Sequence, residues 1–242
     1  MKLKEKIYMN KEGLIKNGPI SIVILGDSIS HGSFLDNIDF EAAYWNLLRK
    51  KIIGIKNYVP VNIINSAIGG ITAGTALDFV ESRAAVYSPD LIIVCFGLND
   101  VNGTLERYLS ALSEIFKKCM ASGAEVIFMT PNMLNTYVAE DTPEKYREYA
   151  AITAEYQNSG RMDKYIYSAK KLAEDMNVTV CDCYSKWKEL SKTQDTTQLL
   201  INRINHPNEK MHEMFADELF KTIFGKDAVT SNKTENTMYQ GY

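Results

Sequence analysis

The sequence is poor in the residues that build metal centres and disulfide frameworks. Among its 242 residues are 4 cysteines and 3 histidines. Cys95 and Cys181 lie in apolar runs, which is typical of buried thiols. Cys181 and Cys183 are expected on opposite faces of one strand, an arrangement that suits neither a disulfide nor a metal clip. We therefore expect no metal site and a reducing compartment, the cytoplasm.

Long apolar runs and a strong excess of either charge are also missing. No run reaches the roughly 18 apolar residues of a membrane span, and the charged N-terminus has no apolar segment of a secretory signal. The net charge is −3, and the lysines and arginines are scattered. This pattern predicts neither nucleic acid nor membrane as a partner, and leaves the oligomeric state undecided.

The remaining composition suits one sizeable domain with a real core, since 45% of the residues are hydrophobic and 24% charged. Apolar runs typical of buried strands lie at 20–25, 61–65, 91–96, 126–130 and 178–182. Helical patterns lie at 40–53, 72–87, 105–120, 161–176 and 209–224, and a loop with helical turns is expected at 132–160. We expect one domain over 1–229, with its core at 20–224 and a polar tail at 230–242.

Strands that alternate with helices predict an α/β fold. The crossovers make the sheet parallel and place helices on both of its faces, giving a three-layer α/β/α sandwich of five strands. The expected strand order is flavodoxin-like, 2-1-3-4-5. Its switch point then falls between the first and third strands, where such sheets bind their ligands.

The end of the first strand carries the most informative motif, Gly26-Asp27-Ser28. Gly26 supplies the backbone freedom for a sharp turn, and Ser28 then lies at the carboxyl end of the strand. A serine at this position is a nucleophile if a base reaches its hydroxyl. Alternatively, Ser28 only caps the helix that follows.

Two further strand ends carry small polar residues and glycine. Asn65 to Gly70 follow the second strand, and Gly97 to Asp100 follow the third. In the expected order these strands are neighbours, so the three segments converge on one crevice. His206 precedes the last helix and is expected on a loop at the same end of the sheet.

These blocks resemble those of the SGNH hydrolases, also called GDSL esterases, over roughly residues 20–224. Gly26-Asp27-Ser28, the glycine at Gly70, the Gly97–Asp100 block and His206-Pro207 match that family in order and spacing. The resemblance implies a three-layer α/β/α fold and ester hydrolysis through a serine nucleophile.

The resemblance also implies a role for each matching residue. Ser28 attacks the ester carbonyl, and His206 takes its proton and returns it to the leaving alcohol. The backbone N–H groups of Ser28 and Gly70 and the side-chain amide of Asn99 form the oxyanion hole. No cofactor is expected, because no glycine-rich phosphate loop opens a helix after the first strand.

The other polar residues near these blocks have simpler interpretations. His31 is expected at the cleft rim or in solvent, and His212 at a solvated or boundary position of the last helix. Asp27 and Asp100 are expected to hold loop backbones through side-chain hydrogen bonds.

One position departs from the family pattern. The residue three before the histidine is usually aspartate, but here it is Arg203, which cannot accept a hydrogen bond from the imidazole. A backbone carbonyl within 200–205 is the first candidate acceptor, followed by Asp195. Asp182, or the amide oxygens of Asn202 and Asn205, are further candidates, and a degenerate enzyme is another.

The substrate is the weakest inference from the sequence. The segment 132–160 carries tyrosines among polar residues, which suits a sugar, although the same rings could pack the loop onto the domain: Tyr137, Tyr146, Tyr149 and Tyr156. We expect removal of a small acyl group, acetyl first, from a carbohydrate-like or other polar ester. The alternatives are a lysophospholipase or thioesterase, and a non-catalytic ligand-binding member of the fold.

Overall fold

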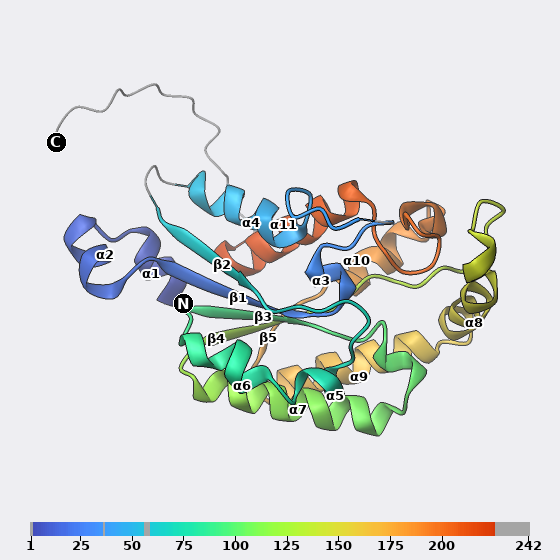
Figure 1. The fold of residues 1–242 in the computed structure, drawn as a ribbon, viewed down its shortest axis with the longest axis horizontal. Coiled ribbons are helices and arrows are strands. Elements are labelled where there is room, and N and C mark those ends of the chain that lie inside the picture. The colour runs from blue at the N-terminus through green and yellow to red at the C-terminus, as the bar shows by residue number, and fades with distance from the viewer. Residues whose placement is uncertain (1, 36, 56–58, 226–242) are drawn as a thin grey trace.

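A five-stranded parallel sheet forms the centre of the protein in a computed structural model that describes residues 2–35, 37–55 and 59–225 (Figure 1). The strands are β1 (Ile20–Gly26), β2 (Val61–Asn65), β3 (Leu91–Cys95), β4 (Glu125–Met129) and β5 (Thr179–Cys181). Their order is β2-β1-β3-β4-β5, and all pairings are parallel. The predicted order is confirmed, whereas the predicted tail at 230–242 lies outside the described residues.

Helices cover both faces of the sheet and make the predicted three layers (Figure 1). One face carries α4 (Tyr44–Ile53) and α11 (Glu209–Phe224), with α10 (Cys183–Leu190) beside α11. The other face carries α5 (Ala73–Ala76), α6 (Val80–Arg83), α7 (Leu105–Ala121) and α9 (Arg161–Asp175). No helix in the described part of the chain is long and apolar enough to cross a membrane.

Burial along the strands explains this arrangement. β3 is buried at every residue and β1 at all but one, as expected for central strands covered on both faces. β2 has only Val61 fully buried and exposes Asn62, because it is an edge strand. The unbroken Ile and Val runs are thus central strands, and the more polar run forms the edge.

The last helix has the predicted bounds, Glu209–Phe224. Asn208 caps it, since its side chain accepts the Met211 N–H. The face that α11 turns to the core contains Phe215, Leu219 and Ile223 at helical spacing.

Two predicted helices differ from those observed. The helix expected at 40–53 begins only at Tyr44. The helix expected at 72–87 is divided into α5, α6 and a 3₁₀ turn at Ala85–Tyr87. Between these pieces the backbone N–H groups of Asp78 and Phe79 bond to carbonyls three residues back, which tightens the chain and breaks the α-helical ladder.

Several helices were not predicted. α8 (Arg147–Asn158) lies in the segment expected to be a loop, and two short helices, α1 (Lys2–Ile7) and α2 (Lys11–Asn17), precede the sheet. The buried face of α8 consists of small or polar residues, Ala150, Thr153, Ala154 and Gln157. It therefore lacks the apolar periodicity by which an amphipathic helix is predicted.

The cysteine pair was also placed wrongly. Cys181 ends β5 and Cys183 begins α10, so the two thiols do not share a strand. The expected geometry was itself wrong, because residues two apart on a strand lie on the same face. The two sulfur atoms are 3.7 Å apart, and both residues are buried as free thiols.

Gly26 gives a direct test of the packing at the end of β1. A Cβ atom here would lie 2.4 Å from Ser30 Oγ and 2.8 Å from the Cys95 carbonyl oxygen. We therefore expect Gly26→Ala to lower the free energy of unfolding by about 1–3 kcal/mol or more. Gly74→Ala is the matched control, because its nearest neighbour would lie at an ordinary 3.5 Å. Urea unfolding measures both, and an unchanged midpoint for Gly26→Ala would contradict this packing.

Candidate active site

Ser28 is the first residue of the short helix α3 (Ser28–His31), directly after β1. Asp27, not Ser28, caps this helix: Asp27 Oδ1 accepts the Ile29 N–H at 3.1 Å. Among the residues that the structure describes, the Ser28 hydroxyl makes no hydrogen bond, and the residue as a whole is 9% exposed. The capping interpretation of Ser28 is therefore wrong, and its hydroxyl is free for another partner.

The three strand ends predicted to converge do contact one another. Gly69 lies against Ser28, since a Cβ atom built on Gly69 would be 3.8 Å from Ser28 Cβ. Asn99 reaches the same segment, where its side-chain amide donates to the Ile71 carbonyl at 2.9 Å. The ends of β1, β2 and β3 thus form one continuous site.

This site offers unpaired hydrogen-bond donors. Within the described ranges, neither the Ser28 N–H nor the Gly70 N–H has an acceptor. The Asn99 amide has two hydrogens and gives one to Ile71, which leaves one free. Gly70 has φ +79°, a conformation that favours glycine, and its Cβ position faces open space.

Two buried carboxyl groups support these loops, as predicted. Asp100 Oδ1 accepts the Ala73 N–H at 2.9 Å, which joins the end of β3 to the start of α5. Burial raises the pKa of Asp27 to about 7 and that of Asp100 to about 6, although a backbone N–H bond opposes the rise in each. One oxygen of each carboxyl group has no partner among the described residues.

His206 lies on a tight hairpin directly before α11, at the predicted end of the sheet. Asn202 Oδ1 accepts the backbone N–H groups of Ile204, Asn205 and His206 at 2.9–3.0 Å. The Ile201 N–H donates to the His206 carbonyl at 2.7 Å and closes the hairpin. These bonds hold the histidine backbone in one position.

The His206 ring is oriented by a backbone carbonyl. Its Nδ1 lies 2.9 Å from the carbonyl oxygen of Phe34, in the loop after α3. The bond assigns the proton to Nδ1 and leaves the lone pair on Nε2. Burial lowers the pKa of His206, while the Phe34 bond opposes this by raising it. The ring is therefore neutral near pH 7, as a general base must be.

Comparisons with known proteins identify the family of this chain. Residues 22–219 match the family GDSL-like Lipase/Acylhydrolase. The chain belongs to this family. It is an acylhydrolase family, whose members are carboxylic ester hydrolases.

The individual proteins that match this chain share only a small part of its sequence. A curated arylesterase of Vibrio mimicus is 28% identical over 110 residues, which are 45% of this chain and 52% of that protein. The match thus spans about half the length of that relative. Among solved structures, Axe2, an acetylxylan esterase from Geobacillus stearothermophilus, has a TM-score of 0.66 at 20% identity and covers 85% of this chain and 94% of its own. A lipase/acylhydrolase from Enterococcus faecalis has a TM-score of 0.63 at 20% identity, covering 84% and 95%.

In this member of the GDSL-like family, Arg203 occupies the position where an aspartate was expected. It has φ +58° and pairs with Asp141, with its Nε and Nη2 at 3.0 and 2.8 Å from the carboxylate. Pairing with Asp141 raises the pKa of Arg203. The prediction that Arg203 pairs with an acidic neighbour is confirmed.

The candidate acceptors named from the sequence do not bond to the His206 imidazole. Asp195 uses its two oxygens for the Tyr137 hydroxyl and the Thr197 N–H. Asp182 pairs with Lys170 and caps α10, and Asn202 and Asn205 bond to each other. A backbone carbonyl was expected within 200–205, and this prediction is wrong. The Ile204 and Asn205 carbonyls accept from the loop after β4, and the imidazole bonds to the Phe34 carbonyl instead.

The other two histidines lie near the site in different environments. His31 ends α3 and lies beside Gly69, 3.7 Å from a Cβ built there. His212 is fully buried, not solvated as predicted. Burial, and secondarily the positive charge of a protonated His206, lower the pKa of His212 to about 3.

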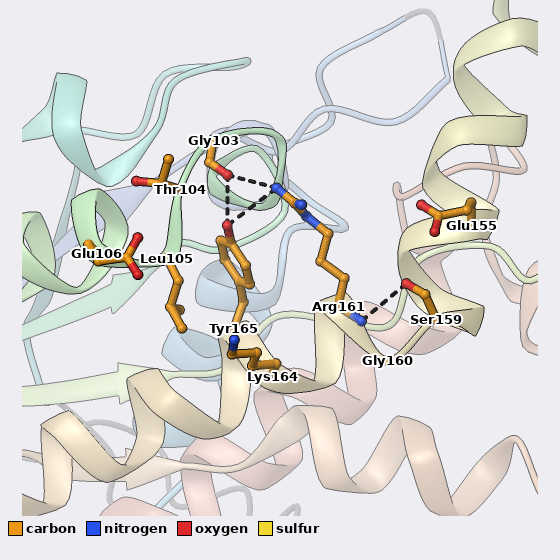
Figure 2. Close-up of a pocket in the computed structure, with 10 residues that line it drawn as sticks. All are labelled: Gly103, Thr104, Leu105, Glu106, Glu155, Ser159, Gly160, Arg161, Lys164 and Tyr165. Carbon is orange, nitrogen blue, oxygen red and sulfur yellow. Dashed lines mark hydrogen bonds between the residues drawn. The ribbon is translucent and has the colours of Figure 1, made fainter.

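Two polar pockets adjoin the end of β3. One, of about 280 Å³, is lined by Thr72, Asp100 and Arg107, among others. The other, of about 540 Å³, shares Gly103 with it and reaches α9, where Figure 2 shows Arg161 and Tyr165 both bonded to the Gly103 carbonyl. Neither pocket is lined by Ser28 or His206.

The tyrosines of the segment 132–160 mainly hold that segment in place. Tyr137 bonds to Asp195, and Tyr149 accepts a hydrogen bond from Asn102 at 3.2 Å. Tyr156 lies under the Arg161 guanidinium, 4.8 Å from ring centroid to Cζ. The packing interpretation is thus supported for these three, and Tyr149 also borders the loop that carries Asn99.

Sequence reasoning missed two functional features. The Phe34 carbonyl leaves no side-chain signal, since any residue supplies a carbonyl. Asn202 had a usable signal, because Asn before a tight turn accepts nearby N–H groups. No group of three or more potential metal ligands occurs among the described residues.

The raised pKa of Asp27 predicts a pH-dependent stability. The folded protein retains this proton up to about pH 7, whereas the unfolded chain releases it near pH 4. The neutral Asp27 carboxyl therefore contributes to the free energy of unfolding at low pH. This contribution falls as the pH rises towards 7, by up to about 1.4 kcal/mol per pH unit. Asp27→Asn keeps an acceptor for Ile29 but cannot ionise.

We expect the melting temperature of Asp27→Asn, relative to wild type, to increase from pH 5 to pH 8. Scanning calorimetry over that range measures the difference. A difference that stays constant or decreases with pH would show that Asp27 is ionised throughout.

Proposed function

We propose that this chain is a serine ester hydrolase that removes a small acyl group, acetyl first, from a carbohydrate-like or other polar ester. The observation that carries the proposal is a free serine hydroxyl beside unpaired N–H donors, together with a neutral histidine whose ring bonds to the loop after the helix of Ser28. Ser28 is the nucleophile, His206 the base, and Gly70 and Asn99 complete the oxyanion hole with the Ser28 N–H.

The reaction proceeds in two balanced halves. Ser28 Oγ attacks the ester carbonyl carbon while its proton passes to His206 Nε2. The tetrahedral intermediate then expels the alcohol, which receives that proton, and leaves an acyl-Ser28. In the second half, His206 Nε2 takes a proton from water as the water oxygen attacks the acyl carbonyl. The tetrahedral intermediate then expels Ser28 Oγ, which receives that proton back from His206, and the acid leaves.

The negative oxygen of the tetrahedral intermediate needs donors fixed in advance. The Ser28 and Gly70 N–H groups and the remaining Asn99 amide hydrogen have no internal acceptor to give up. Donors held in this way stabilise developing charge without reorganisation, and loss of one typically costs about 10²–10³ in turnover.

His206 acts without a carboxylate. The Phe34 carbonyl fixes the ring tautomer, as a triad aspartate would, but it brings no full charge to stabilise the imidazolium. We therefore expect a working Ser28–His206 pair with modest turnover.

The surroundings of Asn99 support a polar substrate. The pocket next to it presents Thr72, Thr75 and Arg107, and Tyr149 borders the same loop through Asn102. Hydroxyl and guanidinium groups suit the hydroxyls of a sugar better than an alkyl chain. The fold shared with an acetylxylan esterase agrees with this choice of substrate class.

Ser28→Ala tests the central assignment. We expect hydrolysis of p-nitrophenyl acetate to fall by at least about 10³-fold, because the nucleophile is gone. A fluorophosphonate probe should label wild type and not Ser28→Ala. Ser33→Ala is the matched control, a nearby serine outside the proposed machinery, and should retain both activity and labelling.

Two results would overturn this assignment. Equal labelling of wild type and Ser28→Ala would exclude Ser28 as the nucleophile. Absence of hydrolysis and labelling in wild type would favour a ligand-binding protein that has kept the cleft alone.

Acyl chain length tests the small-acyl proposal. Along a series of p-nitrophenyl esters we expect kcat/KM to be highest for acetate and poor beyond about eight carbons, since a longer chain must find apolar area to cover it. Efficiency that rises towards the lauroyl or palmitoyl ester would instead indicate lipid hydrolysis.

A further inference from the structure

Phe34 supplies the carbonyl that orients the His206 ring. Its carbonyl accepts the His206 Nδ1–H, and its N–H donates to the Asn37 carbonyl at 2.9 Å. Ser33 N–H, one residue earlier, donates to the Ser28 carbonyl at 2.9 Å. The peptide that orients the base is therefore part of a small hairpin next to the nucleophile.

One buried ring attaches this hairpin to the domain. Leu35 and Ile38 are 44% and 49% exposed, whereas Phe34 is 4% exposed. The Phe34 ring packs on the ring of His212 from α11, with centroids 4.9 Å apart and planes at 35°. The position of the Phe34 carbonyl thus depends on this contact.

His212 is itself held firmly and stays uncharged. Its Nδ1 accepts the Tyr44 N–H at 3.2 Å, the first N–H of α4, which has no side-chain cap of its own. The Phe215 ring meets it edge-on at 6.0 Å, and the Tyr44 ring lies parallel to it at 6.2 Å. Burial lowers the pKa of His212 most; of the titratable groups around this ring, His206 also lowers it and Asp39 raises it, while the Tyr44 ring packs on it.

We infer that His212 is a positioning residue for the reaction: its ring holds Phe34, and Phe34 holds the carbonyl that orients His206. This inference rests on the proposed function. A triad carboxylate would orient the imidazole directly by its own hydrogen bond. Here the Phe34 carbonyl makes that hydrogen bond, and the buried contact between the Phe34 and His212 rings holds the carbonyl in position.

Two substitutions separate the contacts of His212. His212→Asn keeps an oxygen at the position of Nδ1 for the Tyr44 N–H but removes the ring that touches Phe34. His212→Phe keeps a ring against Phe34 but removes the acceptor for Tyr44. A purely structural role predicts similar effects on activity in both, whereas the positioning role predicts a loss in His212→Asn alone.

For His212→Asn we expect kcat on p-nitrophenyl acetate to fall by about 10²-fold, the scale of a reacting group displaced by about 1 Å, with little change in KM. The midpoint of the acidic limb of kcat/KM should also move to lower pH, because the Phe34 bond raises the pKa of His206 and is weakened here. His212→Phe should keep kcat within about threefold of wild type and leave that midpoint in place, although it melts at a lower temperature.

Phe34→Leu tests the same contact from the other side. We expect the same fall in kcat and the same shift of the acidic limb, and the double variant Phe34→Leu/His212→Asn should lose no more than the larger single loss. Leu219→Ala is the control for destabilisation, since Leu219 is equally buried on α11. It should lower the melting temperature without moving the acidic limb.

Three outcomes would overturn the inference. The first is a His212→Asn variant with the kcat and pH profile of wild type. The second is a double variant in which the two losses of kcat add. The third is an equal loss of kcat in His212→Asn and His212→Phe, with the acidic limb of kcat/KM unmoved in both. If His212→Asn does not fold, Phe34→Leu decides alone, and an unchanged profile there overturns the inference. Failure of the proposed function would be distinguishable from failure of this inference, because Ser28→Ala would then hydrolyse p-nitrophenyl acetate as fast as wild type.

Discussion

The parallel register of β2, β1 and β3 is the constraint on which the site depends. Ile24 pairs with Asn65 and Gly26 with Cys95, so the carboxyl ends of all three strands lie together at one end of the sheet. The segments that follow must then share the space there, which brings Gly69 against Ser28 and the Asn99 amide onto the Ile71 carbonyl. Three N–H donors next to one serine follow from strand order rather than from any local motif.

The second property of the site is the replacement of a charged acceptor by a neutral one. Arg203 stands where the family usually has aspartate, and it is paired with Asp141. The Phe34 carbonyl keeps the His206 tautomer without a buried carboxylate. The Phe34 ring packs on the His212 ring, so the loop that supplies the carbonyl is attached to α11, and the His206 ring is bonded to that loop.

Much of the fold was predictable, because β-branched runs alternating with helices leave few topologies, and the last helix has a clear cap at Asn208. α8 was not predictable, since its buried face is alanine, threonine and glutamine. At the site, Ser28, Gly70 and Asn99 could be predicted as neighbours from strand ends alone. The acceptor for His206 could not, because Phe34 contributes a backbone atom that every residue has.

A crystal structure of the protein inactivated by a fluorophosphonate tests the central claim most directly. The account predicts a phosphorus bonded to Ser28 Oγ and a phosphoryl oxygen about 3 Å from the Ser28 N, the Gly70 N and the Asn99 amide nitrogen. His206 Nδ1 should remain on the Phe34 carbonyl. A phosphoryl oxygen directed away from these donors, or His206 bonded through Nδ1 to a carboxylate instead, would contradict it.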